Sequence, residues 1–105
     1  MSRRVLFGPD ASTELSQAAR WYEQRRAGLG VRFLAAVDVA VRSAVRWPQS
    51  GAPVRGVREE LQLRRLRVDR FPYHVVYLVA DDAIHVLAVA HDRRRPGYWR
   101  SRVEP

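Results

Sequence analysis

The stretch YHVVYLVADDAIHVLAVAH, Tyr73–His91, decides the fold. Two apolar runs flank Asp81-Asp82, a dipeptide that favours a two-residue hairpin turn. If Val79 pairs with Ile84, side chains alternate so that the three histidines His74, His85 and His91 share one face. The other face would then carry Tyr73, Val75, Tyr77, Val79, Ile84, Val86, Ala88 and Ala90. We expect helices to pack on the tyrosine face, and the C-terminal tail or another protein to cover part of the histidine face.

A strand is also predicted before this hairpin, in LQLRRLRVD, residues 61–69. Leu61 and Leu63 alternate in one phase, and Leu66 and Val68 in the other. A β-bulge at Arg64–Arg65 would bring all four aliphatic side chains to one face, with the arginines opposite. The preceding segment, residues 48–60, is rich in proline and glycine and has no periodicity, which indicates a loop.

The N-terminal half predicts a short strand, RVLFG, and two helices. The first helix opens at Pro9-Asp10, with Asp10 or Ser12 as its N-cap, and ends near Gly28. The second helix runs to Pro48. Their apolar faces comprise Ala11, Leu15, Ala18, Ala19 and Tyr22 in the first helix, and Phe33, Leu34, Val37, Val41, Ala44 and Val45 in the second. We expect Trp21, Tyr22 and Trp47 to pack in the core.

These elements predict an α+β fold in which a helical hairpin packs on one face of an antiparallel sheet, in the order β-α-α-β-β-β. A small element follows the last strand. The 105 residues form one domain, residues 1–105, because a chain of this length buries a single core.

Composition restricts the function further. The chain has no cysteine, which excludes thiolate catalysis and zinc–sulfur sites. It contains no apolar run of transmembrane length and no signal peptide, so we expect a cytoplasmic protein without a membrane partner. The net charge of +8 indicates an anionic partner, and all 19 basic residues are arginine. The histidines have no paired acidic cluster and the chain has no glycine-rich phosphate loop, so neither a metal nor a nucleotide cofactor is expected.

Three segments carry a resemblance to a known family: ELSQAARWYEQRRAGLGVRFLAAV, RFPYHVVYLV and VLAVAHDRRRPGYWRSR. Together they resemble the RelE/ParE superfamily of type II toxin–antitoxin toxins, in particular the ParE-like, plasmid-stabilisation branch. The resemblance covers nearly the whole chain and implies the fold described above. It also implies a cognate antitoxin that wraps the toxin in a hetero-oligomer and neutralises it.

The superfamily implies two mechanisms. ParE-like members inhibit DNA gyrase by binding and perform no chemistry of their own, and the PGYW ending favours this interpretation. RelE-like members are metal-independent endonucleases that cleave mRNA on the ribosome, so the ribosome and mRNA are the alternative partners. That chemistry needs cations on the phosphate and an acid–base pair. The candidate catalytic residues on this alternative are Arg64, Arg67, His91, Arg93 and Tyr98.

The end of the chain is the candidate contact surface for the target or the antitoxin. Arginine, tyrosine and tryptophan dominate many interfaces and are concentrated here. The candidate binding residues are Arg65, Arg93, Arg94, Arg95, Tyr98, Trp99 and Arg100. Trp99 has an alternative role as a lid packed on the core.

Overall fold

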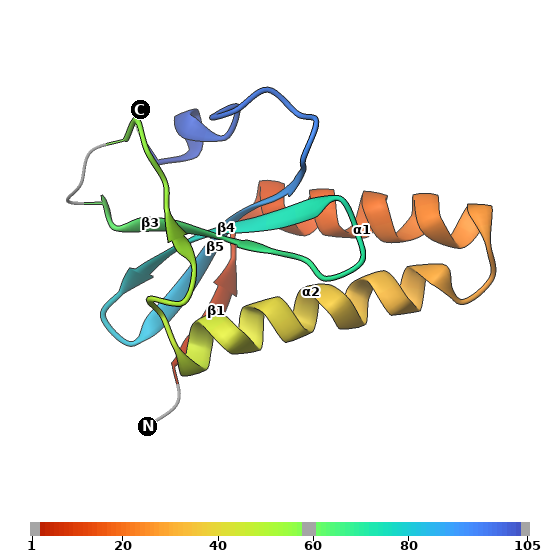
Figure 1. Ribbon diagram of the computed structural model, residues 1–105, viewed down its shortest axis with the longest axis horizontal. Helices are drawn as coiled ribbons and strands as arrows, with labels where there is room; N and C mark the ends of the chain where they lie inside the picture. The colour runs from red at the N-terminus through yellow and green to blue at the C-terminus, as the bar shows by residue number, and fades with distance from the viewer. Residues whose placement is uncertain (1–2, 58–60, 104–105) are drawn as a thin grey trace.

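The computed structural model describes residues 3–57 and 61–103. The elements are β1 (Arg4–Phe7), α1 (Pro9–Arg25), α2 (Leu29–Arg46), β2 (Ala52–Pro53), β3 (Leu63–Arg67), β4 (Tyr73–Ala80), β5 (Ala83–His91) and the 3₁₀ helix η2 (Arg100–Arg102). Figure 1 shows α1 and α2 as a hairpin beside the twisted sheet, with the C-terminal segment on the side of the sheet away from α2. The α+β fold predicted from the sequence is confirmed.

The two helices begin and end close to the predicted positions. The N-cap of α1, however, is Gly8, so the predicted caps Asp10 and Ser12 are wrong: both already lie inside the helix, behind Pro9 at its first position. Gly28 has a φ of +88°, a left-handed conformation that lets the chain turn sharply into α2. The side chain of Glu23 accepts hydrogen bonds from the N–H groups of Gly28 and Gly30, which satisfies two donors at the start of α2.

The sheet has the strand order β1-β5-β4-β3-β2. β3, β4 and β5 form an antiparallel meander, and Val79 pairs with Ile84 as predicted. Two features depart from the prediction. β1 pairs with β5 in parallel, and residues 52–53 of the expected loop form the short edge strand β2. Two residues are too few for alternation to reveal a strand.

The β-bulge lies elsewhere than predicted. β3 pairs with β4 in continuous register, so the expected bulge at Arg64–Arg65 is wrong. The register shift occurs instead between Val76 and Tyr77 of β4, where Leu87 of β5 is the extra residue. Consequently, β3 places Leu63 on one face of the sheet and Leu66 on the other.

The same bulge changes which residues of β5 share a face. After Leu87, Val89 turns to the helix-bearing face, while Ala88 and Ala90 turn to the opposite face. His91 then pairs with Tyr73 and contacts its ring, so the prediction that all three histidines share a face is wrong. An extra residue shifts the period-2 alternation by one position for the rest of the strand.

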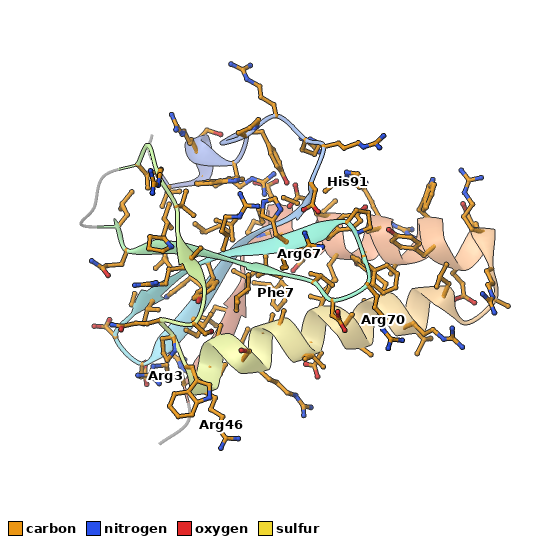
Figure 2. All side chains as sticks on the ribbon, viewed as in Figure 1. Arg3, Phe7, Arg46, Arg67, Arg70 and His91 are labelled. Carbon is orange, nitrogen blue, oxygen red and sulfur yellow. The ribbon has the colours of Figure 1, made fainter. Side chains whose placement is uncertain are left out.

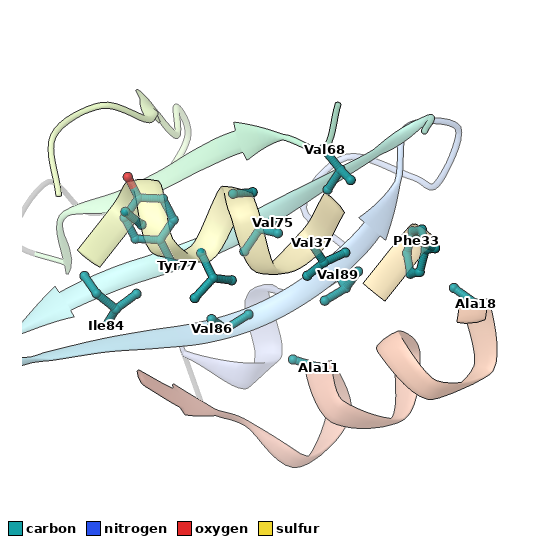
Figure 3. Packing of buried hydrophobic residues seen from close by; sticks show 13 residues of the cluster. Ala11, Ala18, Phe33, Val37, Val68, Val75, Tyr77, Ile84, Val86 and Val89 are labelled. Carbon is teal, nitrogen blue, oxygen red and sulfur yellow. The ribbon is translucent and has the colours of Figure 1, made fainter. Parts of the chain in front are cut away.

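Each face of the sheet has its own core. The larger core lies between the sheet and the helices and is shown in Figure 3. Its most deeply buried members include Phe33, Val37, Val75, Tyr77, Ile84, Val86 and Val89. The smaller core lies on the opposite face, which is called the open face below, and consists of Leu63, Val76, Ala88, Ala90 and Trp99. Tyr98 and Val103 pack against it. The C-terminal tail, which was one of the two covers predicted from the sequence, therefore lies over part of this face.

Three apolar residues expected in the core are exposed. Leu34, Trp21 and Trp47 are 42%, 51% and 62% exposed, whereas Tyr22 packs against Phe33 and Phe71. Trp21 instead stacks under the guanidinium of Arg25, and Trp47 lies near that of Arg46. No described helix is long and apolar enough to cross a bilayer.

Candidate functional site

A cleft of about 390 Å³ lies on the open face, between the β2–β3 edge and the loop that follows β5. Its floor is the smaller core, and its walls are largely basic. The lining residues are Pro53, Val54, Arg55, Arg65, His74, Val76, Ala90, His91, Asp92, Arg94, Arg95, Pro96, Gly97, Tyr98, Trp99 and Arg100. This cleft, the arginine cleft, therefore gathers two distant parts of the sequence around one concave surface.

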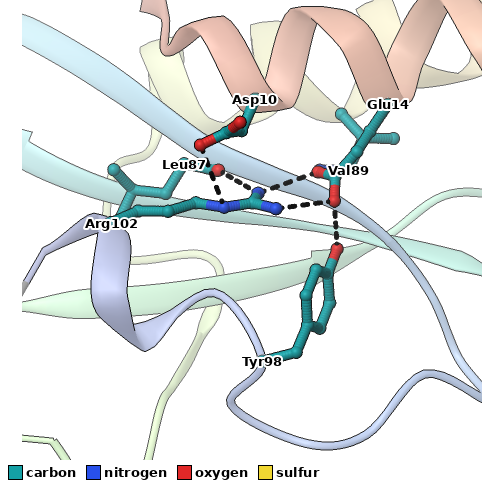
Figure 4. A network of polar contacts seen from close by, with 6 residues as sticks. All are labelled: Asp10, Glu14, Leu87, Val89, Tyr98 and Arg102. Carbon is teal, nitrogen blue, oxygen red and sulfur yellow. Dashed lines mark hydrogen bonds and ion pairs between the residues drawn. The ribbon is translucent and has the colours of Figure 1, made fainter.

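The tail wall of the cleft is fixed by a polar network around Glu14 of α1 (Figure 4). The Tyr98 hydroxyl donates a hydrogen bond of 2.6 Å to Glu14 Oε2. Arg102 donates to both carboxylate oxygens, at 3.0 and 2.9 Å, and also to the Leu87 carbonyl oxygen at 2.8 Å. The Val89 N–H donates to Glu14 Oε1, and Asp10 lies 3.6 Å from Arg102 Nε. One carboxylate thus joins α1, the bulged part of β5 and the tail.

The network alters the ionisation of its members. Burial would raise the pKa of the Glu14 carboxyl, but hydrogen bonds from Arg102, Tyr98 and the Val89 N–H lower it below its ordinary value. Burial, together with the hydrogen bond to Glu14, raises the pKa of Tyr98 well above its ordinary value. The hydrogen bond to Glu14 also raises the pKa of Arg102. At neutral pH, Tyr98 is therefore a neutral donor held by an anionic carboxylate.

Two arginines of the cleft are held by packing. The guanidinium carbon of Arg94 lies 3.9 Å from the centre of the Tyr98 ring. The Arg100 side chain lies against Gly56 and Gly97, where added Cβ atoms would be 2.5 Å and 2.9 Å from its nitrogens. Both glycines have positive φ, so these two turns require glycine for conformation as well as for space. The tail wall is therefore preorganised.

Histidines lie on the rim of the cleft. His74 Nδ1 is 2.9 Å from Asp92 Oδ1, and this pair links β4 to the turn after β5. His91 Nδ1 accepts a hydrogen bond from the Arg93 N–H at 3.0 Å. This contact requires an unprotonated Nδ1 on His91.

Most of the predicted binding residues line this cleft. Arg65, Arg94, Arg95, Tyr98, Trp99 and Arg100 do so, whereas Arg93 is exposed on the turn just outside it. Trp99 is only 4% exposed, because it packs as a lid on the smaller core. Its side chain therefore shapes the floor and offers little surface to a partner.

The residues suggested for ribonuclease chemistry are dispersed. His91 and Tyr98 line the cleft, while Arg67 and Arg93 are exposed outside its lining. Arg64 lies in the phase of Leu66, on the helix-bearing side, and donates to the carbonyl oxygen of Gly51 at 2.7 Å. Arg64 therefore ties β3 to the loop after α2, away from the arginine cleft.

Glu14 and Arg102 were not recognised from the sequence as a pair. They are 88 residues apart, and each resembles an ordinary surface charge in its own segment. The one available signal was that Glu14 lies three residues after Ala11 and four before Ala18 of the apolar face of α1, but this does not identify its partner. Within residues 3–57 and 61–103, no group of three or more His, Asp or Glu side chains is arranged to hold a metal ion.

Comparisons with known proteins agree with this architecture. The model of the family described as "ParE toxin of type II toxin-antitoxin system, parDE" matches residues 5–96. Among solved structures, the chain is similar to one described as "Chromosomal ParDE TA system from P. aeruginosa". The TM-score is 0.68 at 15% identity, covering 85% of this chain and 95% of that chain, which shows a shared fold. No curated protein matches the sequence significantly.

Proposed function

Because the chain belongs to the ParE toxin family of type II toxin–antitoxin systems, we propose that it inhibits DNA gyrase by binding and leaves the DNA cleaved. The observation that carries this proposal is the family match, which extends over residues 5–96. The whole chain, residues 1–105, acts as one toxin domain in the cytoplasm.

The partner that neutralises the toxin is a cognate antitoxin, bound in a hetero-oligomer. The surface of the chain supports such a partner in two ways. Its net charge of +8 favours an acidic protein, and Val31 and Val39 of α2 are 68% and 65% exposed. Figure 2 shows basic side chains projecting around the molecule, among them Arg46 at the end of α2 and Arg70 after β3. An antitoxin that wraps the toxin could neutralise these charges and cover the apolar side chains.

The binding mechanism has more support than the ribonuclease alternative. RNA cleavage needs cations and an acid–base pair to meet at one phosphate. Here Arg64 binds loop carbonyls on the other side of the sheet. The hydroxyl of Tyr98 is already engaged by Glu14, and its raised pKa makes it a poor proton donor at neutral pH. A surface that binds without chemistry fits these contacts better.

Controlled expression in a bacterium without the antitoxin tests the proposal. We expect growth to stop, DNA breaks to accumulate and the DNA-damage response to be induced, while mRNA stays intact. A strain whose gyrase carries a resistance mutation selected against the toxin provides the matched control and should grow. Ribosome-dependent mRNA cleavage without DNA breaks would establish the ribonuclease alternative instead.

A further inference from the structure

The arginine cleft contains cations that have no anionic partner within residues 3–57 and 61–103. Five guanidinium groups line it, those of Arg55, Arg65, Arg94, Arg95 and Arg100. Among the described residues, none of the five forms an ion pair with a carboxylate. Asp92 is the one acidic residue in the described lining, and it is already bound to His74. Such a concentration of like charge in a concave surface attracts an anion.

Two of these cations are positioned in advance. The guanidinium of Arg94 packs on the ring of Tyr98, and the Tyr98 hydroxyl is hydrogen-bonded to Glu14. The Arg100 side chain packs against Gly56 and Gly97. Because packing already orders these side chains, an anion that binds them loses less free energy to side-chain ordering. The contacts that hold Arg94 and Arg100 therefore position them for a ligand.

The chemistry of the cleft indicates a phosphate polymer. Guanidinium forks bind phosphate and carboxylate through paired hydrogen bonds. A peptide that binds a cleft of this kind also needs apolar pockets for its anchor side chains. Val76, Ala90 and Trp99 of the floor are only 1%, 1% and 4% exposed, so the floor offers little surface to an anchor side chain. Guanidinium groups, in contrast, stand on both walls of the cleft.

The arrangement of the cations suits a strand with one charge on each unit. Arg65 lines the cleft from β3, and Arg67, just outside the lining, projects from the same face about 7 Å further along the strand. Arg94 and Arg100 lie on the opposite wall. A volume of about 390 Å³ accommodates a short stretch of one strand.

We propose that the arginine cleft binds the phosphodiester backbone of a single DNA strand. The choice of DNA over RNA rests on the proposed function, because gyrase acts on DNA and the toxin would meet the strand there. The cleft would then contact the DNA while other surfaces of the toxin contact the enzyme.

Fluorescence anisotropy with a labelled thymidine oligonucleotide of about 12 nucleotides tests this without gyrase. The full chain carrying Arg94→Gln and Arg100→Gln should bind at least about tenfold more weakly than the wild type. Its slope of log K against log salt should be shallower by about 1.4, because two phosphate contacts are lost. The matched control, Arg20→Gln with Arg32→Gln, makes the same change of charge on exposed helix positions and should stay within about twofold of the wild type.

A second variant distinguishes a loss of DNA binding from a loss of the fold. Arg65→Gln with Arg95→Gln alters two exposed cleft residues whose side chains make no hydrogen bond, ion pair or ring contact within the described part of the chain, and it should also weaken binding. Circular dichroism checks that each variant is folded.

Three results would overturn the proposal. The first is an equal loss of affinity in the control variant, which would show that net charge alone matters. The second is tighter binding of an RNA oligonucleotide of the same length. The third is a cleft variant that binds the DNA oligonucleotide as tightly as the wild type does but binds a labelled acidic peptide more weakly. The proposed function is judged separately: a chain that binds DNA through the cleft but never inhibits gyrase would disprove only that function.

Discussion

At the scale of single residues, Glu14 holds the C-terminal tail in place. Its carboxylate accepts hydrogen bonds from a backbone N–H, a tyrosine hydroxyl and an arginine, and it is largely buried with a side-chain exposure of 15%. Tyr98 in turn supports Arg94 of the cleft. A partly buried acid on a helix thus helps to position a cation on the opposite face of the sheet.

Replacing Glu14 by glutamine tests this role. Glu14→Gln keeps the shape but removes the charge, so it weakens several charge-assisted hydrogen bonds at once. We expect the free energy of unfolding to fall by about 2 kcal/mol in urea denaturation. Asp38→Asn is the control: it breaks the exposed pair with Arg42 on α2 and should cost at most about 0.5 kcal/mol. Equal losses for the two variants would contradict the role of Glu14.

The stability of the chain at acidic pH gives a second residue-scale prediction. The pKa of Glu14 is lowered in the folded state, so its contribution to stability is present above its unfolded pKa, near 4.3, and is lost as the pH falls through the folded value. The wild type should therefore lose stability more steeply than Glu14→Gln below about pH 4.3. Melting temperatures of both proteins from pH 7 to pH 3 would measure the difference, and parallel curves would count against it.

At the scale of elements, alternation and turn chemistry predicted most of the fold. The helices, the β3–β4–β5 meander, the pairing of Val79 with Ile84 and the helix-bearing face all followed from periodicity and from the Asp81-Asp82 turn. The faces of β3 and of the second half of β5 did not. A bulge depends on the register between neighbouring strands. Residues 87–90, LAVA, are all apolar, so the sequence does not show which of them face the helices.

The candidate site, like the fold, could be predicted only in part from the sequence. Sequence composition located the arginines and aromatic residues of the tail wall, because they cluster after β5, but Arg55 of the opposite wall was not predicted. The contributions of Glu14, Gly56 and Arg102 depend on contacts between distant segments, and no local pattern encodes those contacts. The buried lid role of Trp99 was one of two alternatives that the sequence left open.

An element-scale prediction concerns Tyr77, which joins β4 to the loop after α2. Its hydroxyl donates to the Pro48 carbonyl oxygen at 2.8 Å and accepts from the Gly51 N–H at 3.1 Å. Tyr77→Phe leaves both backbone groups unpaired, and we expect a loss of about 2 kcal/mol in the free energy of unfolding. Tyr22→Phe is a matched control, because no hydrogen bond of its hydroxyl is found among the described residues, and it should change stability by less than about 0.5 kcal/mol. A Tyr77 variant as stable as the control would show that the loop is held by other contacts.

At the scale of the whole molecule, the larger core and the arginine cleft lie on opposite faces of the sheet. The helices and one face of the sheet form the larger core, while the open face combines a small core with the arginine cleft. The tail closes the small core and at the same time supplies one wall of the cleft. We therefore expect loss of charge on the turn and tail to alter activity without loss of the fold.

Toxicity of a double variant in cells tests this separation. Arg93→Ala with Arg94→Ala removes two exposed cations from the turn after β5 and should relieve growth inhibition, while the melting temperature stays within a few degrees of the wild type. Arg20→Ala with Arg26→Ala removes the same charge from exposed positions in and just after α1 and should remain toxic. Wild-type toxicity of the first variant would remove this turn from the mechanism.

Gyrase inhibition is tested most directly by a supercoiling assay with purified gyrase and purified, folded toxin. We expect the toxin to inhibit supercoiling in a dose-dependent way, and denaturation of the reaction to release cleaved DNA. Addition of the cognate antitoxin should abolish both effects. Normal supercoiling and intact DNA at saturating amounts of folded toxin would show that gyrase is not its target.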